Sequence, residues 1–159
     1  MKEGFRSIFR SFIEHRDLKI VFVGSASPGG KPNTAPKLLV DIEMPNAVYY
    51  LDHFFTSTYR NVRRNPQASV AFMDDHKFTG FRLTGSCRPL RPGAEFSRVH
   101  TAWEKRLNRY LAARIVERIK GEGEAGMAEM DLPKDFVIMK VAAREAALVK
   151  PDRVLKRRA

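Results

Sequence analysis

Three consecutive hydroxyl side chains, Thr56, Ser57 and Thr58, stand directly before a short predicted helix. The helix is expected over residues 58–64, because threonine and serine oxygens cap helix N-termini and Pro66 cannot continue a helix. Backbone amides at the positive end of a helix bind anions, and hydroxyls add further donors. The pattern therefore predicts a site for a phosphate dianion, to which nearby guanidinium groups can add charge. These belong to Arg60, Arg63 and Arg64.

Other residue types that could do chemistry form no motif. The four histidines, at positions 15, 53, 76 and 100, lie more than twenty residues apart and match no metal-binding spacing, so we expect no metal site. His53 precedes Phe54 and Phe55, and two readings stay open for it: an exposed loop histidine or one that reaches a bound ligand. Cys87 lies in a predicted strand, where a buried, unreactive thiol is expected.

The elements that must position the hydroxyl run are mostly strands. Alternating and β-branched segments bounded by turn residues predict strands over residues 19–25, 32–41, 47–51, 68–73, 78–89 and 136–141, with residues 144–149 as an extension of the last. Within the fifth of these, Gly80 and Gly85 indicate bulges or close approach of the backbone. The last residues, 156–159, are expected to be poorly ordered.

Two further helices are predicted from apolar residues recurring every three or four positions. One covers residues 5–13. The other covers residues 96–119, with a break near Asn108, and Trp103 in its apolar stripe is expected in the core or at a dimer interface. Strands without regular βαβ alternation favour a mainly β (α+β) fold, an antiparallel barrel covered by helices.

Composition limits the class of protein. The 159 residues suffice for one domain, which we take as 1–159. No segment is apolar and long enough to span a bilayer, and a single cysteine favours a reducing compartment, so we expect a cytoplasmic protein without a membrane partner. The net charge of +11 is spread along the chain rather than gathered into a stripe, so nucleic acid is not the expected main partner.

Four segments in order resemble the pyridoxamine 5'-phosphate oxidase-like FMN-binding split-barrel family. They are Gly-Lys-Pro-Asn-Thr-Ala-Pro-Lys after the first strand, Val-Tyr-Tyr-Leu-Asp at 48–52, the run from Thr56 through Asn61-Val-Arg-Arg-Asn65-Pro66, and Gly-Phe-Arg-Leu-Thr-Gly at 80–85. The resemblance implies an antiparallel six-stranded split β-barrel with flanking helices. It also implies a homodimer with FMN at the interface between the subunits.

The resemblance carries over to individual positions. It places the isoalloxazine ring against two strand segments, and it implies Lys37 as the cation that tunes the flavin. Family members can carry a basic residue where this chain has Thr58. The cofactor-binding residues expected in all are Ala35, Pro36, Lys37, Leu38, Tyr50, Leu51, Asp52, Thr56, Ser57, Thr58, Asn61 and Arg63.

The function implied is that of an FMN-dependent oxidoreductase that takes a hydride from a nicotinamide donor or a small-molecule substrate, with no catalytic residue assigned. A substrate is not specified, and nothing after Pro89 matches a pattern for binding pyridoxamine phosphate. Three alternatives stay open on the same barrel: a non-catalytic flavin or haem carrier, a deazaflavin-dependent reductase, and a basic nucleic-acid-binding barrel without a cofactor.

Overall fold

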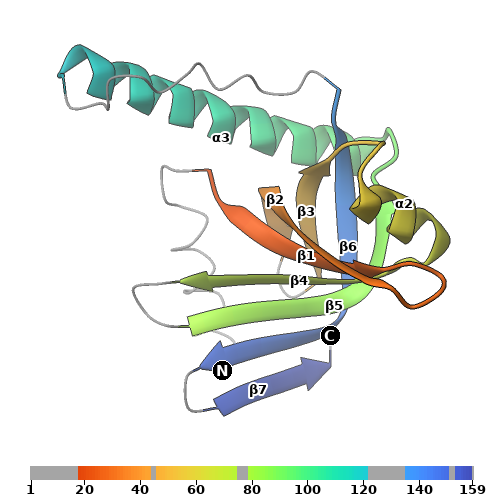
Figure 1. The fold of residues 1–159 in the computed structure, drawn as a ribbon. Coiled ribbons are helices and arrows are strands. Elements are labelled where there is room, and N and C mark those ends of the chain that lie inside the picture. The colour runs from red at the N-terminus through yellow and green to blue at the C-terminus, as the bar shows by residue number, and fades with distance from the viewer. Residues whose placement is uncertain (1–17, 44–45, 75–78, 122–134, 151–152, 159) are drawn as a thin grey trace.

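The computed structural model describes residues 18–43, 46–74, 79–121, 135–150 and 153–158. The helix predicted over residues 5–13 lies outside them. The described chain consists of strands and two helices (Figure 1). The strands are β1 (Ile20–Ala26), β2 (Pro32–Glu43), β3 (Ala47–Asp52), β4 (Gln67–Asp74), β5 (Thr79–Pro89), β6 (Val137–Lys150) and β7 (Arg153–Arg158), and the helices are α2 (Ser57–Arg64) and α3 (Ala94–Ile119).

Six of the strands form a closed antiparallel barrel in the order β3-β2-β1-β4-β5-β6, which β3 closes by pairing with β6. This confirms the predicted fold class. The two segments predicted at 136–141 and 144–149 form one long strand, because β6 continues through a register shift opposite Gly85. Its first half pairs with β3, and its second half, beyond the end of β3, pairs with β7.

The carboxyl-terminal tail was predicted wrongly. Residues 153–158 form β7, where the sequence suggested poor order from residue 156. The reason lies in β6, whose residues beyond β3 would otherwise present unpaired amides and carbonyls along one edge. A basic composition does not prevent pairing when a neighbouring strand offers these partners.

Side-chain alternation divides the core into two parts. Val21 and Val23 of β1, and Val48 and Tyr50 of β3, point into the barrel. Tyr49 and neighbouring residues of β3 with the opposite orientation belong instead to a second cluster beneath α3, with Val99 and Trp103 of that helix. Every residue of β3 is therefore buried, because the strand has the barrel interior on one side and a helix on the other.

Helix α3 is continuous, so the predicted break near Asn108 is wrong. Asn108 is exposed, and an asparagine facing solvent does not compete with the helical hydrogen bonds. The first half of α3 is fixed to the barrel by Arg106, which donates to the Leu39 carbonyl at 3.2 Å, and by Glu95, which accepts from the Tyr49 hydroxyl at 2.7 Å and pairs with Lys140. The contacts with Lys140 and Tyr49 lower the pKa of Glu95.

No helix of the described residues is long and apolar enough to cross a membrane.

Glycine is required at position 85, where the backbones of β5 and β6 approach each other closely. A Cβ atom at this position would lie 1.9 Å from the Ala142 carbonyl oxygen, whereas a Cβ atom at Gly80 would meet nothing nearer than 3.4 Å. The close approach predicted for Gly85 is confirmed, and it coincides with the register shift between Thr84 and Gly85.

We expect Gly85→Ala to destabilise the barrel by about 3 kcal/mol or more, because backbone atoms of β6 must move to admit the methyl group. Urea unfolding followed by the fluorescence of Trp103 measures the loss. Gly80→Ala is the matched control and should change the free energy of unfolding by much less. Equal losses in the two variants would contradict the role given to the β5–β6 crossing.

Candidate functional site

The site predicted from sequence lies where β3 ends and α2 begins, at one end of the barrel (Figure 1). Thr56 is the N-cap of α2, as its hydroxyl oxygen accepts from the Tyr59 amide at 3.0 Å. The helix begins at Ser57 and ends at Arg64 before Asn65-Pro66, close to the predicted bounds. Val62 of α2 packs on the core, so the helix covers the end of the barrel.

A buried ion pair lies beneath this corner. Lys37 Nζ of β2 donates to Asp52 Oδ1 at 2.5 Å, and the two side chains are 9% and 0% exposed. The same oxygen accepts from the His53 amide and from the Thr56 hydroxyl, each at 2.8 Å. Asp52 Oδ2 is buried without a hydrogen-bond partner among the described residues. The Lys37 ammonium therefore offsets the carboxylate charge and joins β2 to the β3–α2 corner.

Four polar side chains attach α2 to the first hairpin. Asn33 Nδ2 lies 3.1 Å from Thr58 Oγ1 and 3.3 Å from Ser25 Oγ. Asn61 Nδ2 donates to the same Ser25 oxygen at 3.2 Å. Thr58 is buried, so its hydroxyl serves the packing of α2. Ser25 and Asn33 were not among the residues expected at the site, although Asn33 stands two and four residues before Ala35 and Lys37, on the same face of β2.

Outside this polar cluster, α2 presents a basic surface. Ser57, Arg60, Arg63 and Arg64 are exposed, and Arg60 reaches Ser57 Oγ at 3.4 Å. Of the three predicted hydroxyls, only Ser57 is thus on the surface, since Thr56 caps the helix and contacts Asp52. An anion at the N-terminus of α2 would meet Ser57 and Arg60, whereas Arg63 and Arg64 lie in the last turn of the helix.

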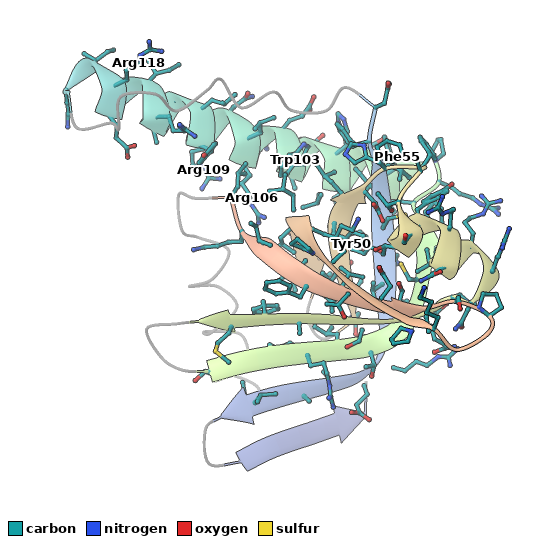
Figure 2. All side chains as sticks on the ribbon, viewed as in Figure 1. Tyr50, Phe55, Trp103, Arg106, Arg109 and Arg118 are labelled. Carbon is teal, nitrogen blue, oxygen red and sulfur yellow. The ribbon has the colours of Figure 1, made fainter. Side chains whose placement is uncertain are left out.

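Two exposed aromatic rings flank the same corner. Phe54 and Phe55 are 57% and 75% exposed, and Figure 2 shows Phe55 near α2. Phe55 stacks on His53 with ring centroids 5.2 Å apart. Phe54 and Tyr59 make a T-shaped contact with ring centroids 5.3 Å apart. His53 Nδ1 also lies 2.8 Å from the Asp135 carbonyl oxygen, so this ring holds the loop against the start of β6.

The strand residues predicted to contact a cofactor do not share one surface. Ala35 and Lys37 pair with Val23 and Val21 and so face the barrel, whereas Pro36 lies opposite the exposed Phe22 on the outer face. The remaining three candidates belong to the core: Tyr50 is inside the barrel, and Leu38 and Leu51 contribute to the cluster beneath α3. The side chains of consecutive strand residues alternate between faces, so those of Ala35 to Leu38 point to both sides of β2.

Cys87 has the environment expected of a structural thiol. It is buried, and its Sγ lies 3.3 Å from the Tyr50 hydroxyl. Burial raises the pKa of Cys87 to about 11, and it raises the pKa of Tyr50 as well. The thiol therefore stays protonated at neutral pH and is no nucleophile. Within the described ranges, no three histidine, cysteine or acidic side chains gather to hold a metal ion.

We expect Asp52→Asn to destabilise the protein by about 3 kcal/mol, because it leaves the Lys37 ammonium buried without its counter-charge. Lys37→Met should also destabilise the protein, because it leaves the Asp52 carboxylate buried without its counter-charge. Combining the two should lower stability by less than the sum of the single losses, as urea unfolding of the four proteins in the cycle will measure. Strict additivity would show that the two side chains do not interact.

The fold is found in solved structures of low sequence identity. A protein from Clostridium acetobutylicum, related to general stress protein 26 and ascribed to the pyridoxinephosphate oxidase family, aligns with a TM-score of 0.64 and 18% identity over 99% of this chain and 96% of its own. A pyridoxamine 5'-phosphate oxidase-related, FMN-binding protein from Nostoc punctiforme gives 0.56 and 9% over 98% and 87%. A heme-binding protein from Mycobacterium smegmatis gives 0.60 and 15% over 89% and 53%.

No curated protein matches the sequence. The sequence model of the family described as pyridoxamine 5'-phosphate oxidase, in contrast, matches residues 8–150. The match extends over nearly all of the barrel and includes the β3–α2 corner with its ion pair and basic helix. By this match and by its fold, the chain belongs to the pyridoxamine 5'-phosphate oxidase family.

Proposed function

We propose that this protein binds FMN at the β3–α2 corner and acts as a flavin-dependent oxidoreductase. The observation that carries the proposal is the meeting, in a chain of this family, of exposed cations on α2 with two exposed phenyl rings on the adjoining loop. A flavin mononucleotide combines a phosphate dianion with a flat aromatic ring system, and the corner offers partners of both kinds.

The residues at the corner can hold a phosphate, although fewer of the predicted hydroxyls are free to do so. Thr56 and Thr58 are used within the protein, so Ser57 and the Arg60 guanidinium would hold the phosphate at the start of α2, with Arg63 and Arg64 adding positive charge from the last turn. The arginines of α2 would supply the positive charge that a basic residue in place of Thr58 would otherwise give to the phosphate site. Neutral hydroxyls bind phosphate more weakly than guanidinium groups do, so the arginines should supply most of the affinity.

The flavin ring would use Phe54 and Phe55 as apolar partners. Lys37 would act on the ring only through its position beneath the corner, because its ammonium is buried and paired with Asp52. Asp52 and Thr56 hold this lysine and the start of α2 in place. Bound FMN would supply the redox chemistry, accepting a hydride from a nicotinamide or an organic substrate and passing electrons on. The protein's part is to bind, orient and tune, and that part requires no acid or base catalyst.

We further propose a homodimer that places the cofactor between two subunits. Ile20 and Phe22 of β1 and Met73 of β4 are more than half exposed on one outer face of the barrel. Phe22 is paired with Pro36 on one side and Ala71 on the other, which makes this face continuously apolar. Such a patch favours self-association.

The single cysteine, buried as a free thiol, supports a cytoplasmic location.

The purified protein should be yellow and should take up added FMN. Ser57→Ala combined with Arg60→Gln should weaken FMN binding by about tenfold or more but leave the binding of riboflavin, which lacks the phosphate, nearly unchanged. Fluorescence titration with both flavins measures this ratio. Lys105→Gln removes an equal charge from α3 and should leave the ratio unchanged.

Absorbance spectroscopy decides between this function and its alternatives. Loss of the flavin absorbance on adding NADH or NADPH supports the oxidoreductase, and a flavin spectrum that resists both points to a carrier or another donor. A Soret band would indicate haem. Mass spectrometry of the released group distinguishes FMN from a deazaflavin, and a colourless protein that does not take up FMN would overturn the proposal.

Phe22→Glu combined with Met73→Glu should convert the dimer into a monomer, because two like charges would face each other across a symmetric interface. Light scattering coupled to gel filtration reports the mass. FMN affinity should fall in the same variant, since the cofactor would lose the partner's contribution. A variant that remains a dimer would place the interface elsewhere.

A further inference from the structure

The second half of α3 extends beyond the barrel (Figure 1) and carries large exposed apolar residues. With 26 residues, α3 is about 39 Å long, and its buried residues Val99, Trp103 and Arg106 all belong to its first half. Figure 2 shows Trp103 near the barrel and Arg118 at the far end of the helix. In the second half Leu111, Ile115, Val116 and Ile119 are 38%, 60%, 48% and 80% exposed.

These four residues form one face of the helix, which we call the α3 stripe. At about 100° per residue they span an arc of about 140°, whose centre lies about 150° away from Trp103. The α3 stripe therefore points away from the barrel, and among the described residues none covers these four side chains. Ala112 falls within the same arc and adds to its apolar character.

Cations border the α3 stripe on both sides. Arg118 lies along one edge, and Arg109 and Lys120 lie along the other, all three exposed. Arg114, next to Arg118, donates to the Tyr110 hydroxyl at 2.8 Å. Against these four cations, residues 109–120 contain one acidic residue, Glu117. An apolar arc between two basic edges is the arrangement of helices that lie in the interface of an anionic bilayer.

We propose that the α3 stripe binds the surface of an anionic lipid bilayer, with its apolar residues among the acyl chains and the bordering cations at the headgroups. The bordering cations, together with the apolar residues, favour an anionic bilayer over a second copy of this chain or a nucleic acid. Two copies of a stripe with four cations each would repel, in a protein that already carries a net charge of +11. Nucleic acid would be attracted by the cations but would leave the four apolar side chains in water.

The proposal departs from the expectation of no membrane partner. That expectation rested on the lack of a spanning segment, and a helix lying on a bilayer requires none. The sequence shows the same apolar periodicity in both halves of α3. Only the fold shows that the first half is covered and the second is not.

Co-sedimentation of the full-length protein with vesicles tests the proposal. Vesicles of equal parts phosphatidylcholine and phosphatidylserine should bind the protein, and vesicles of phosphatidylcholine alone should bind it weakly. Leu111→Gln combined with Ile115→Gln and Ile119→Gln should weaken binding by about tenfold or more. Arg118→Gln and Lys120→Gln should each weaken it about fivefold. Lys31→Gln, which removes a charge from the exposed β1–β2 turn, is the control and should have little effect.

Several outcomes would overturn the proposal. One is a lack of binding to the anionic vesicles, and another is equal binding to both kinds. Full binding by the triple glutamine variant would show a general attraction of cations to lipid. A change from dimer to monomer in that variant without lipid would assign the stripe to self-association, and a lower unfolding temperature would show that the chain itself covers the stripe. Retained gel-filtration mass and unfolding temperature are the expected results.

Discussion

The arrangement of the candidate site depends on one oxygen atom, Asp52 Oδ1. It accepts from the Lys37 ammonium, the His53 amide and the Thr56 hydroxyl, and so connects β2, the end of β3 and the N-cap of α2. A carboxylate without accessible surface is stable only if donors replace the lost water. The position of α2, and with it the direction of its arginines, follows from satisfying this buried charge.

The barrel beneath the site is maintained by a second constraint, the shared use of β6. One edge of this strand pairs with β5 along its length, and the other pairs first with β3 and then with β7. The change of partner occurs near the register shift at Gly85, where the two backbones approach so closely that no side chain fits. Closing the barrel thus fixes the end of β3, from which Asp52 and the loop with Phe54 and Phe55 continue.

The positive charge of the chain has no single explanation. Part of it belongs to α2 at the candidate FMN site, and part borders the apolar residues of the projecting half of α3. The two exposed apolar surfaces also differ in character. The outer face of β1 and β4 is bordered by Arg82 of β5, which pairs with Ala71 and lies 3.7 Å from Glu145, so its charge is offset and the face suits self-association. The α3 stripe lies between several cations, which suits an anionic surface.

The amino-acid sequence alone accounts for the approximate positions of the strands along the chain, the bounds of α2 and the family resemblance, because these depend on local signals such as side-chain alternation, the capping Thr56 and the stop at Asn65-Pro66. Lys37, Asp52, Thr56 and Thr58 are among the twelve cofactor-binding residues expected from the sequence and the family resemblance. What Lys37 and Thr58 do follows from the fold, because their partners are distant in the chain: Lys37 meets Asp52, and Thr58 turns inward to Asn33. The same holds for the pairing of the basic tail as β7 and for the exposed half of α3. Pairing and exposure are set by which element lies alongside, and periodicity in one segment carries no information about that neighbour.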